Sequence, residues 1–111
     1  MTILNRGQIV VYPTKTFETW AISHSEDELF FSETPEPTVY LIEEEFWDEE
    51  ELLKKYAKKI VKQEFDALDD SITIYPKIET IDDFTKFFIY EIGSFVFDLL
   101  KTPIKFDKID S

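Results

Sequence analysis

The sequence predicts an α+β fold: a single two-layer domain with a small mixed sheet of three or four strands and about three helices. Two kinds of pattern predict it. Short runs rich in β-branched and aromatic residues are typical of strands, and longer runs with an apolar residue every three or four positions are typical of helices. The chain has 111 residues, 43% hydrophobic and 16% aromatic, which is enough for one core. We therefore expect one domain over residues 1–111.

The most strongly specified element is a helix within the stretch Trp47 to Leu68. Asp48 stands at the N-cap, and Glu51 follows at the capping-box position. Trp47 and Leu52 have the spacing of a hydrophobic staple, which predicts that they pack together. One apolar stripe runs along the helix through Leu53, Ala57, Ile60, Val61, Phe65 and Leu68, widened by Leu52 and Tyr56. We expect this stripe to be buried.

The N-terminal part predicts a strand, a helix, a loop and a second strand. Residues 8–12 (QIVVY) form the first strand, and Thr14 caps a short helix that ends near His24. Residues 25–37 are acidic, contain two prolines and predict a loop with one apolar anchor. The anchor consists of Leu29, Phe30 and Phe31. Residues 38–42 (TVYLI) are nearly all apolar, which suits a strand in the middle of the sheet.

The C-terminal part predicts one more helix and one more strand. Residues 71–78 suit either a short edge strand or an extended connection around Pro76. The next helix begins after Thr80, buries Phe84, Phe87, Phe88 and Ile92, and stops at Gly93. Residues 94–99 alternate like a strand, and residues 101–111 form an irregular tail held partly by Ile104 and Phe106. The two connections that contain the first helices are long enough to join parallel strands. We therefore expect a sheet that mixes parallel and antiparallel pairs.

The charge is unevenly distributed along the chain. The net charge is −12, and thirteen of the 24 carboxylates lie in residues 1–53 with only Arg6 and Lys15 to balance them. That part carries −11 and the remainder −1. Such a negative field, reaching about 8 Å in physiological salt, disfavours nucleic acid and anionic membranes as direct partners. With no leader and no apolar run near the roughly 20 residues of a membrane helix, the chain is expected to be cytoplasmic.

One segment, EEEFWDEEE at residues 43–51, invites a functional interpretation, and we call it the acidic strip. Its candidate partner-binding residues are Glu43, Glu44, Glu45, Phe46, Trp47, Asp48, Glu49 and Glu50. Three interpretations of the strip are open. It is a solvated helix start, a surface whose own aromatic residues anchor a basic partner protein, or a weak Ca²⁺ or Mg²⁺ site. The glycine and the spacing of an EF-hand are absent, so a strong calcium site is not expected.

Residue types also argue against most enzyme chemistry. Without cysteine there is no thiolate nucleophile, disulfide or thiolate metal site. His24 is the only histidine, and no G-x-S-x-G, phosphate-binding glycine loop, dinucleotide fingerprint or HExxH occurs. We expect no catalytic residues, no cofactor and no resident metal, and predict that the protein is not an enzyme.

Three motifs resemble those of a family of small acidic bacterial proteins. They are N-R-x-x-I-V-V-x-P-x-x-x-F-x-x-W at Asn5 to Trp20, VYLIEE at Val39 to Glu44, and F-x-x-x-F-x-x-E before a strand that ends in Asp98 and Leu99. The resemblance spans most of the chain and implies a compact bacterial cytoplasmic domain. It implies no active site and no ligand.

The leading functional hypothesis is a small acidic interaction module that binds a basic partner surface, in an inhibitor, immunity-type or nucleic-acid-mimic role. The alternatives are a weak divalent-cation binder and a soluble domain whose acidic surface has no function of its own. The sequence does not specify the oligomeric state.

Overall fold

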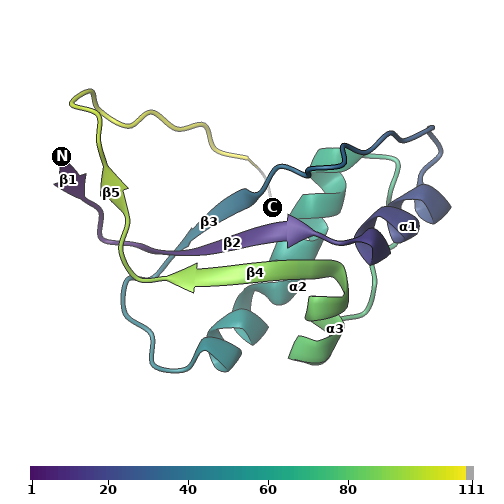
Figure 1. Ribbon diagram of the computed structural model, residues 1–111, viewed down its shortest axis with the longest axis horizontal. Helices are drawn as coiled ribbons and strands as arrows, with labels where there is room; N and C mark the ends of the chain where they lie inside the picture. Colours follow the sequence, from purple (N-terminus) through teal and green to yellow (C-terminus); the bar gives the residue numbers. More distant parts are fainter. Residues whose placement is uncertain (110–111) are drawn as a thin grey trace.

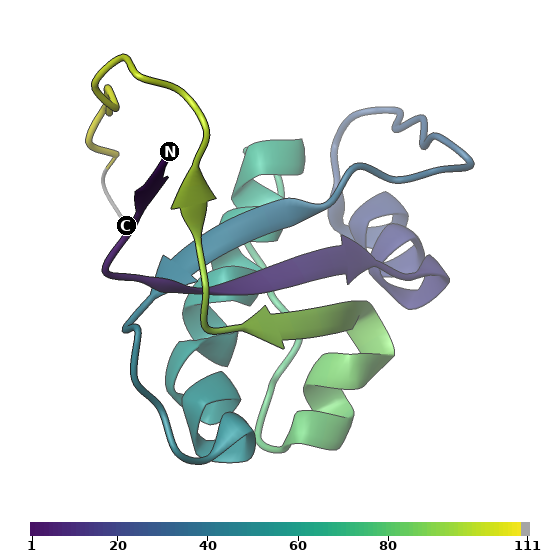
Figure 2. The ribbon, with the colours of Figure 1, turned by 60° about the vertical axis from the view of Figure 1, so that its left-hand side comes forward.

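The computed structural model describes residues 1–109, and its centre is a three-stranded sheet with helices packed on one face (Figures 1 and 2). In chain order the elements are β1 (Thr2–Ile3), β2 (Gly7–Pro13), α1 (Lys15–His24), β3 (Thr38–Ile42), α2 (Glu49–Leu68), α3 (Ile81–Phe87), β4 (Phe88–Gly93) and β5 (Phe97–Asp98). A second sheet pairs β1 with β5. The predicted α+β class is confirmed, as are three helices and a three-stranded main sheet within residues 1–109.

The strands run antiparallel throughout, so the expectation of a mixed sheet with parallel crossovers is wrong. The order is β3-β2-β4, with Val11 opposite Thr38 and Val10 opposite Glu91. The first helix begins directly after β2, and the loop 25–37 brings the chain back to that same end of the sheet. β3 must therefore run opposite to β2. The prediction that β3 occupies the middle of the sheet is also wrong, because β2 lies there.

Alternate residues of the sheet point into the core, as the two-residue period of a strand requires. Ile9 and Val11 are fully buried on the helix side. The predicted stripe of α2 is buried against them, with Leu68 and Tyr56 at its half-buried margin. Stacked and tilted aromatic rings fill the centre: Phe17 lies 4.3 Å from Phe65 and 5.3 Å from Phe88, between ring centroids.

The helix starts follow the sequence closely, with two exceptions at α2, of which the first is that the Glu51 side chain makes no capping-box bond to the backbone of Asp48. Asp48 accepts hydrogen bonds from the backbone N–H groups of Glu50 and Glu51, and Thr80 forms a reciprocal capping box with Asp83. The predicted staple is wrong, because the side chain of Trp47 is 98% exposed. Phe46 packs against the core instead. With Phe46 partly buried against the core, the adjacent Trp47 is left in solvent.

The third helix is shorter than predicted and gives way to a strand. It ends at Phe87, and residues 88–93 pair with β2 as β4. The buried positions Phe84, Phe87 and Phe88 are as expected, but Gly93 closes a strand rather than a helix. The run FIYEI is rich in β-branched and aromatic residues, and β2 offers it a free edge.

The connections resolve the remaining sequence alternatives. Residues 71–78 form an extended connection and no strand, with Ile72 and Ile78 in the core. The loop 25–37 is irregular as predicted; Leu29 and Phe31 anchor it to the core, whereas Phe30 is exposed. None of the helices in residues 1–109 combines the length and apolarity needed to cross a bilayer.

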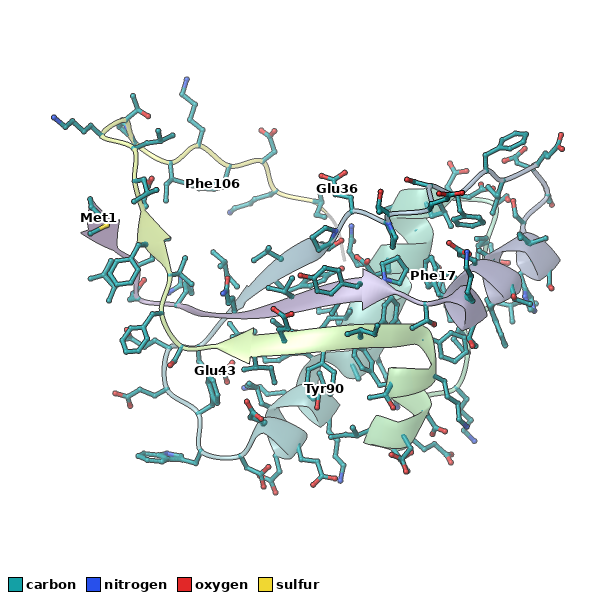
Figure 3. The ribbon with its side chains drawn as sticks, viewed as in Figure 1. Met1, Phe17, Glu36, Glu43, Tyr90 and Phe106 are labelled. Atoms are coloured by element: carbon teal, nitrogen blue, oxygen red, sulfur yellow. The ribbon has the colours of Figure 1, made fainter. Side chains whose placement is uncertain are left out.

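Both ends of the chain depart from the expectations. The predicted strand over 94–99 is reduced to β5, which pairs with the unpredicted β1 to form a two-stranded ribbon. The tail is irregular over 101–109, and its last two residues lie outside the described range. Its predicted anchors Ile104 and Phe106 are exposed, and Phe106 is seen on the outlying tail in Figure 3.

Candidate functional site

The acidic strip lies where the chain leaves β3 and enters α2. Residues 43–48 form the connecting loop, and residues 49–51 form the first turn of the helix. Glu43, labelled in Figure 3, stands at the start of this loop. The structure divides the candidate residues into those that hold the loop in place and those that face solvent.

Glu43 belongs to the first group. Its carboxylate accepts hydrogen bonds from Lys55 Nζ at 2.8 Å and from Tyr56 Oη at 2.6 Å. The bond to Lys55, followed by the bond to Tyr56, lowers the pKa of Glu43 from 4.5 to about 2. Glu43 therefore ties the loop to the second turn of α2. It is not available to a partner unless these bonds break.

A pH dependence follows from this contact. Because the pKa of Glu43 is depressed in the folded protein, its contribution to loop attachment is complete above about pH 4.5 and is lost as the pH falls towards 2. We expect the carboxyl group to titrate near pH 2 in an NMR titration. Lys55→Met should return the pKa towards 4.5, and Lys54→Met, which removes a neighbouring charge without this contact, should leave it low. A wild-type Glu43 that titrates near 4.5 would contradict the geometry.

Asp48 and Phe46 are also occupied within the protein. The Asp48 carboxylate caps α2, with Oδ1 2.9 Å from the backbone nitrogen of Glu50. Phe46 is half-buried and packed against the core beside Gly7. These two residues and Glu43 determine the shape of the loop rather than its binding surface.

The remaining five residues form an exposed group that we call the Trp47 patch. It consists of Glu44, Glu45, Trp47, Glu49 and Glu50, all of which are exposed. Within residues 1–109 none of its four carboxylates forms an ion pair. A shallow hollow beside the patch is lined by Glu43, Glu45, Phe46, Trp47, Asp48, Glu51, Leu52 and Lys55. The patch thus offers an exposed indole side chain in the same short stretch of chain as four carboxylates that form no ion pair within residues 1–109.

A second polar cluster, which the sequence did not reveal, joins the end of α1 to the end of α2. Ser25 Oγ donates to the Asp69 carboxylate, which also accepts from the backbone N–H of Ser71 at 2.9 Å. The bond from Ser25, followed by that from Ser71, lowers the pKa of Asp69, whereas the nearby charge of Asp69 raises the pKa of Asp27. Ser25 and Asp69 are 44 positions apart, so no local pattern could have linked them. The cluster holds the loop 25–37 against α2.

His24 makes its contacts within its own helix. Its ring stacks on Trp20 with 4.2 Å between centroids, and Nδ1 lies 2.9 Å from the carbonyl oxygen of Trp20. Ser25, the next residue, directs its hydroxyl to Asp69 rather than to the imidazole. Across residues 1–109, no group of three or more His, Cys, Asp or Glu side chains is placed to hold a metal ion.

Comparisons of the chain with protein-family models, with curated proteins and with solved structures found no match.

Proposed function

We propose that the protein is a small acidic interaction module whose Trp47 patch binds a basic surface on another protein. Inhibitors, immunity-type proteins and nucleic-acid mimics act in this way. One observation carries the proposal: an indole with 98% of its surface exposed stands among carboxylates that have no partner in residues 1–109. Exposing a tryptophan to water is unfavourable, and tryptophan is among the residues most enriched at binding hot spots.

The chemistry of the patch indicates arginine- or lysine-bearing partners. A guanidinium group can stack on the indole face while its N–H groups donate to neighbouring carboxylates. The net charge of −11 in residues 1–53 attracts a basic partner before contact, which raises the association rate. The Asp48 cap and the bonds of Glu43 hold the loop in one shape, which reduces the entropy lost on binding.

The test is a pull-down from the source cells with four proteins: wild type, Trp47→Ala, a patch variant and a matched control. The patch variant carries Glu44→Gln, Glu45→Gln, Glu49→Gln and Glu50→Gln. The control carries Glu26→Gln, Glu28→Gln, Glu33→Gln and Glu36→Gln, which remove the same charge from exposed positions of the loop 25–37. All four must first show the same thermal unfolding.

We expect wild type and control to retain one basic protein and both patch-directed variants to lose it by at least tenfold. Retention should also fall between about 50 and 300 mM salt, because salt screens the attraction. If the control loses the partner as completely as the patch variant, overall charge and not this patch is responsible. If all four proteins retain the same set, the proposal is wrong.

A further inference from the structure

The face of the main sheet that points away from the helices is apolar. The side chains of Val39 and Leu41 on β3 are 52% and 51% exposed, and Ile89 on β4 is 62% exposed. Val10 and Tyr12 of β2 are half-buried on the same face, since they alternate with the fully buried Ile9 and Val11. The register places Val39 beside Val10 and Ile89 beside Tyr12. An antiparallel sheet with one open face normally presents polar residues there, so this face lacks a cover.

The β1–β5 ribbon lies at the end of the main sheet where β2 begins and β4 ends (Figure 1), and it carries exposed apolar residues of its own. Ile3, Phe95 and Phe97 are all more than half exposed on it. The rings of Phe95 and Phe97 lie parallel, with 6.4 Å between centroids. Two residue pairs, Thr2 with Asp98 and Ile3 with Phe97, join the ribbon, together with a hydrogen bond from Leu4 N to Val96 O at 2.8 Å. So short a pairing is weak alone and gains from packing against another surface.

The charge of this region differs from that of the rest of the molecule. Among the outward-facing residues of the three main strands, Glu91 carries the one charge. The ribbon, the tail and the link from β1 to β2 carry four basic residues against three acidic ones: Arg6, Lys101, Lys105 and Lys108 against Asp98, Asp107 and Asp110. The surface is therefore not acidic, although the chain carries −12. A basic partner would find no negative surface to bind here. A second copy of the chain could approach without repulsion from a cluster of like charges.

We propose that this surface is the interface of a homodimer, in which the open sheet faces of two copies pack together with their ribbons alongside. A two-fold interface requires a patch that is complementary to itself, and an apolar sheet face whose one charged residue, Glu91, lies on the edge strand β4 meets that requirement. Six exposed side chains (Val39, Leu41, Ile89, Ile3, Phe95 and Phe97) together present roughly 600 Å², close to the roughly 800 Å² that each partner of a stable dimer buries. The dimer goes beyond the proposed function, because it uses a surface separate from the Trp47 patch.

The test is sedimentation equilibrium of the full chain. We expect the wild type to have about twice the monomer mass of 13.2 kDa at about 50 µM. Leu41→Lys with Ile89→Lys places charges in the interface and should raise the dissociation constant by at least 100-fold. The matched control is Ile22→Lys with Ile74→Lys, at similarly exposed positions away from the sheet face, and it should remain dimeric. Phe95→Ser with Phe97→Ser changes only the ribbon and should weaken the dimer at least tenfold without touching the main sheet.

Salt separates this proposal from the proposed function. Higher salt screens the repulsion between two chains of charge −12 and should tighten the dimer, whereas it should weaken the binding of a basic partner. A wild type that sediments at 13.2 kDa up to about 0.5 mM would overturn the dimer. Equal dissociation of the face variant and the control would overturn it as well, and neither result would affect the Trp47 patch.

Discussion

Phe65→Ala is expected to lower the free energy of unfolding by about 3–5 kcal/mol, the largest effect of any single substitution considered for this protein. Phe65 is fully buried on α2, and its ring stacks on Phe17 of α1 with 4.3 Å between centroids. Truncation removes a large apolar side chain and leaves a cavity between two helices and the sheet. Urea unfolding followed by circular dichroism measures the loss, at one fixed protein concentration because dimerisation would add to apparent stability.

Phe30→Ala is the matched control for this measurement. It makes the same chemical change at a side chain that is 85% exposed, so the expected loss is below about 0.5 kcal/mol. The slope of the free energy of unfolding against urea concentration should be the same in both variants. Equal slopes would show that the unfolded states are comparable. A loss below about 1 kcal/mol for Phe65→Ala would mean that Phe65 is not at the centre of the core.

The parts of the fold that the sequence predicted well are those determined by nearby residues. The start of α2 follows from Asp48, and its buried face follows from the spacing of Leu53, Ala57 and Phe65. The start of α3 after Thr80, where Thr80 and Asp83 form a capping box, follows from nearby residues in the same way. Each depends on residues within one or two helical turns, which a single sequence contains in full.

Strand direction and strand position depend on distant residues, and they were predicted wrongly. The apolar run 38–42 has the composition of a central strand but lies at an edge, because β4 takes the other side of β2. The helical spacing of Phe84, Phe87 and Phe88 predicts a helix that continues to Gly93, but residues 88–93 form a strand. Only the pairing with β2, more than 70 positions away in the sequence, makes them a strand. The two-residue pairing of β1 with β5 has no detectable local signal.

The candidate site shows the same division between local and distant determinants. The sequence located the acidic strip but gave no sign of which carboxylates are free. Glu43 is bound by Lys55 and Tyr56, twelve and thirteen positions later, and not by a helical neighbour. Trp47 is exposed next to Phe46, whose ring lies beside Gly7 of β2, a residue distant in the sequence.

Gly7→Ala is expected to destabilise the protein by about 1–3 kcal/mol and to disturb the acidic strip as well. A Cβ at position 7 would lie 3.0 Å from the carbonyl oxygens of Glu43 and Gly93 and 3.3 Å from the ring of Phe46. No glycine of the described chain has a positive φ, so the cost is steric rather than conformational. Relief requires the backbone at Glu43 and the ring of Phe46 to move, and both belong to the loop that carries Trp47. Urea unfolding and the amide NMR shifts of residues 43–48 measure the two effects.

Gly93→Ala provides the comparison, because it makes the same change one strand away. Its nearest neighbour would be the side-chain amide of Gln8 at 3.3 Å, the end of a flexible side chain that can move aside. Replacing a strand glycine by alanine also reduces the conformational freedom of the unfolded chain, so Gly93→Ala should be neutral or stabilising by up to about 1 kcal/mol. If both variants lose the same stability, crowding at Gly7 is not the cause. If Gly7→Ala is destabilised but the shifts of residues 43–48 do not change, the shape of the Trp47 loop does not depend on Gly7, and its position must be held by Glu43 and Asp48 alone.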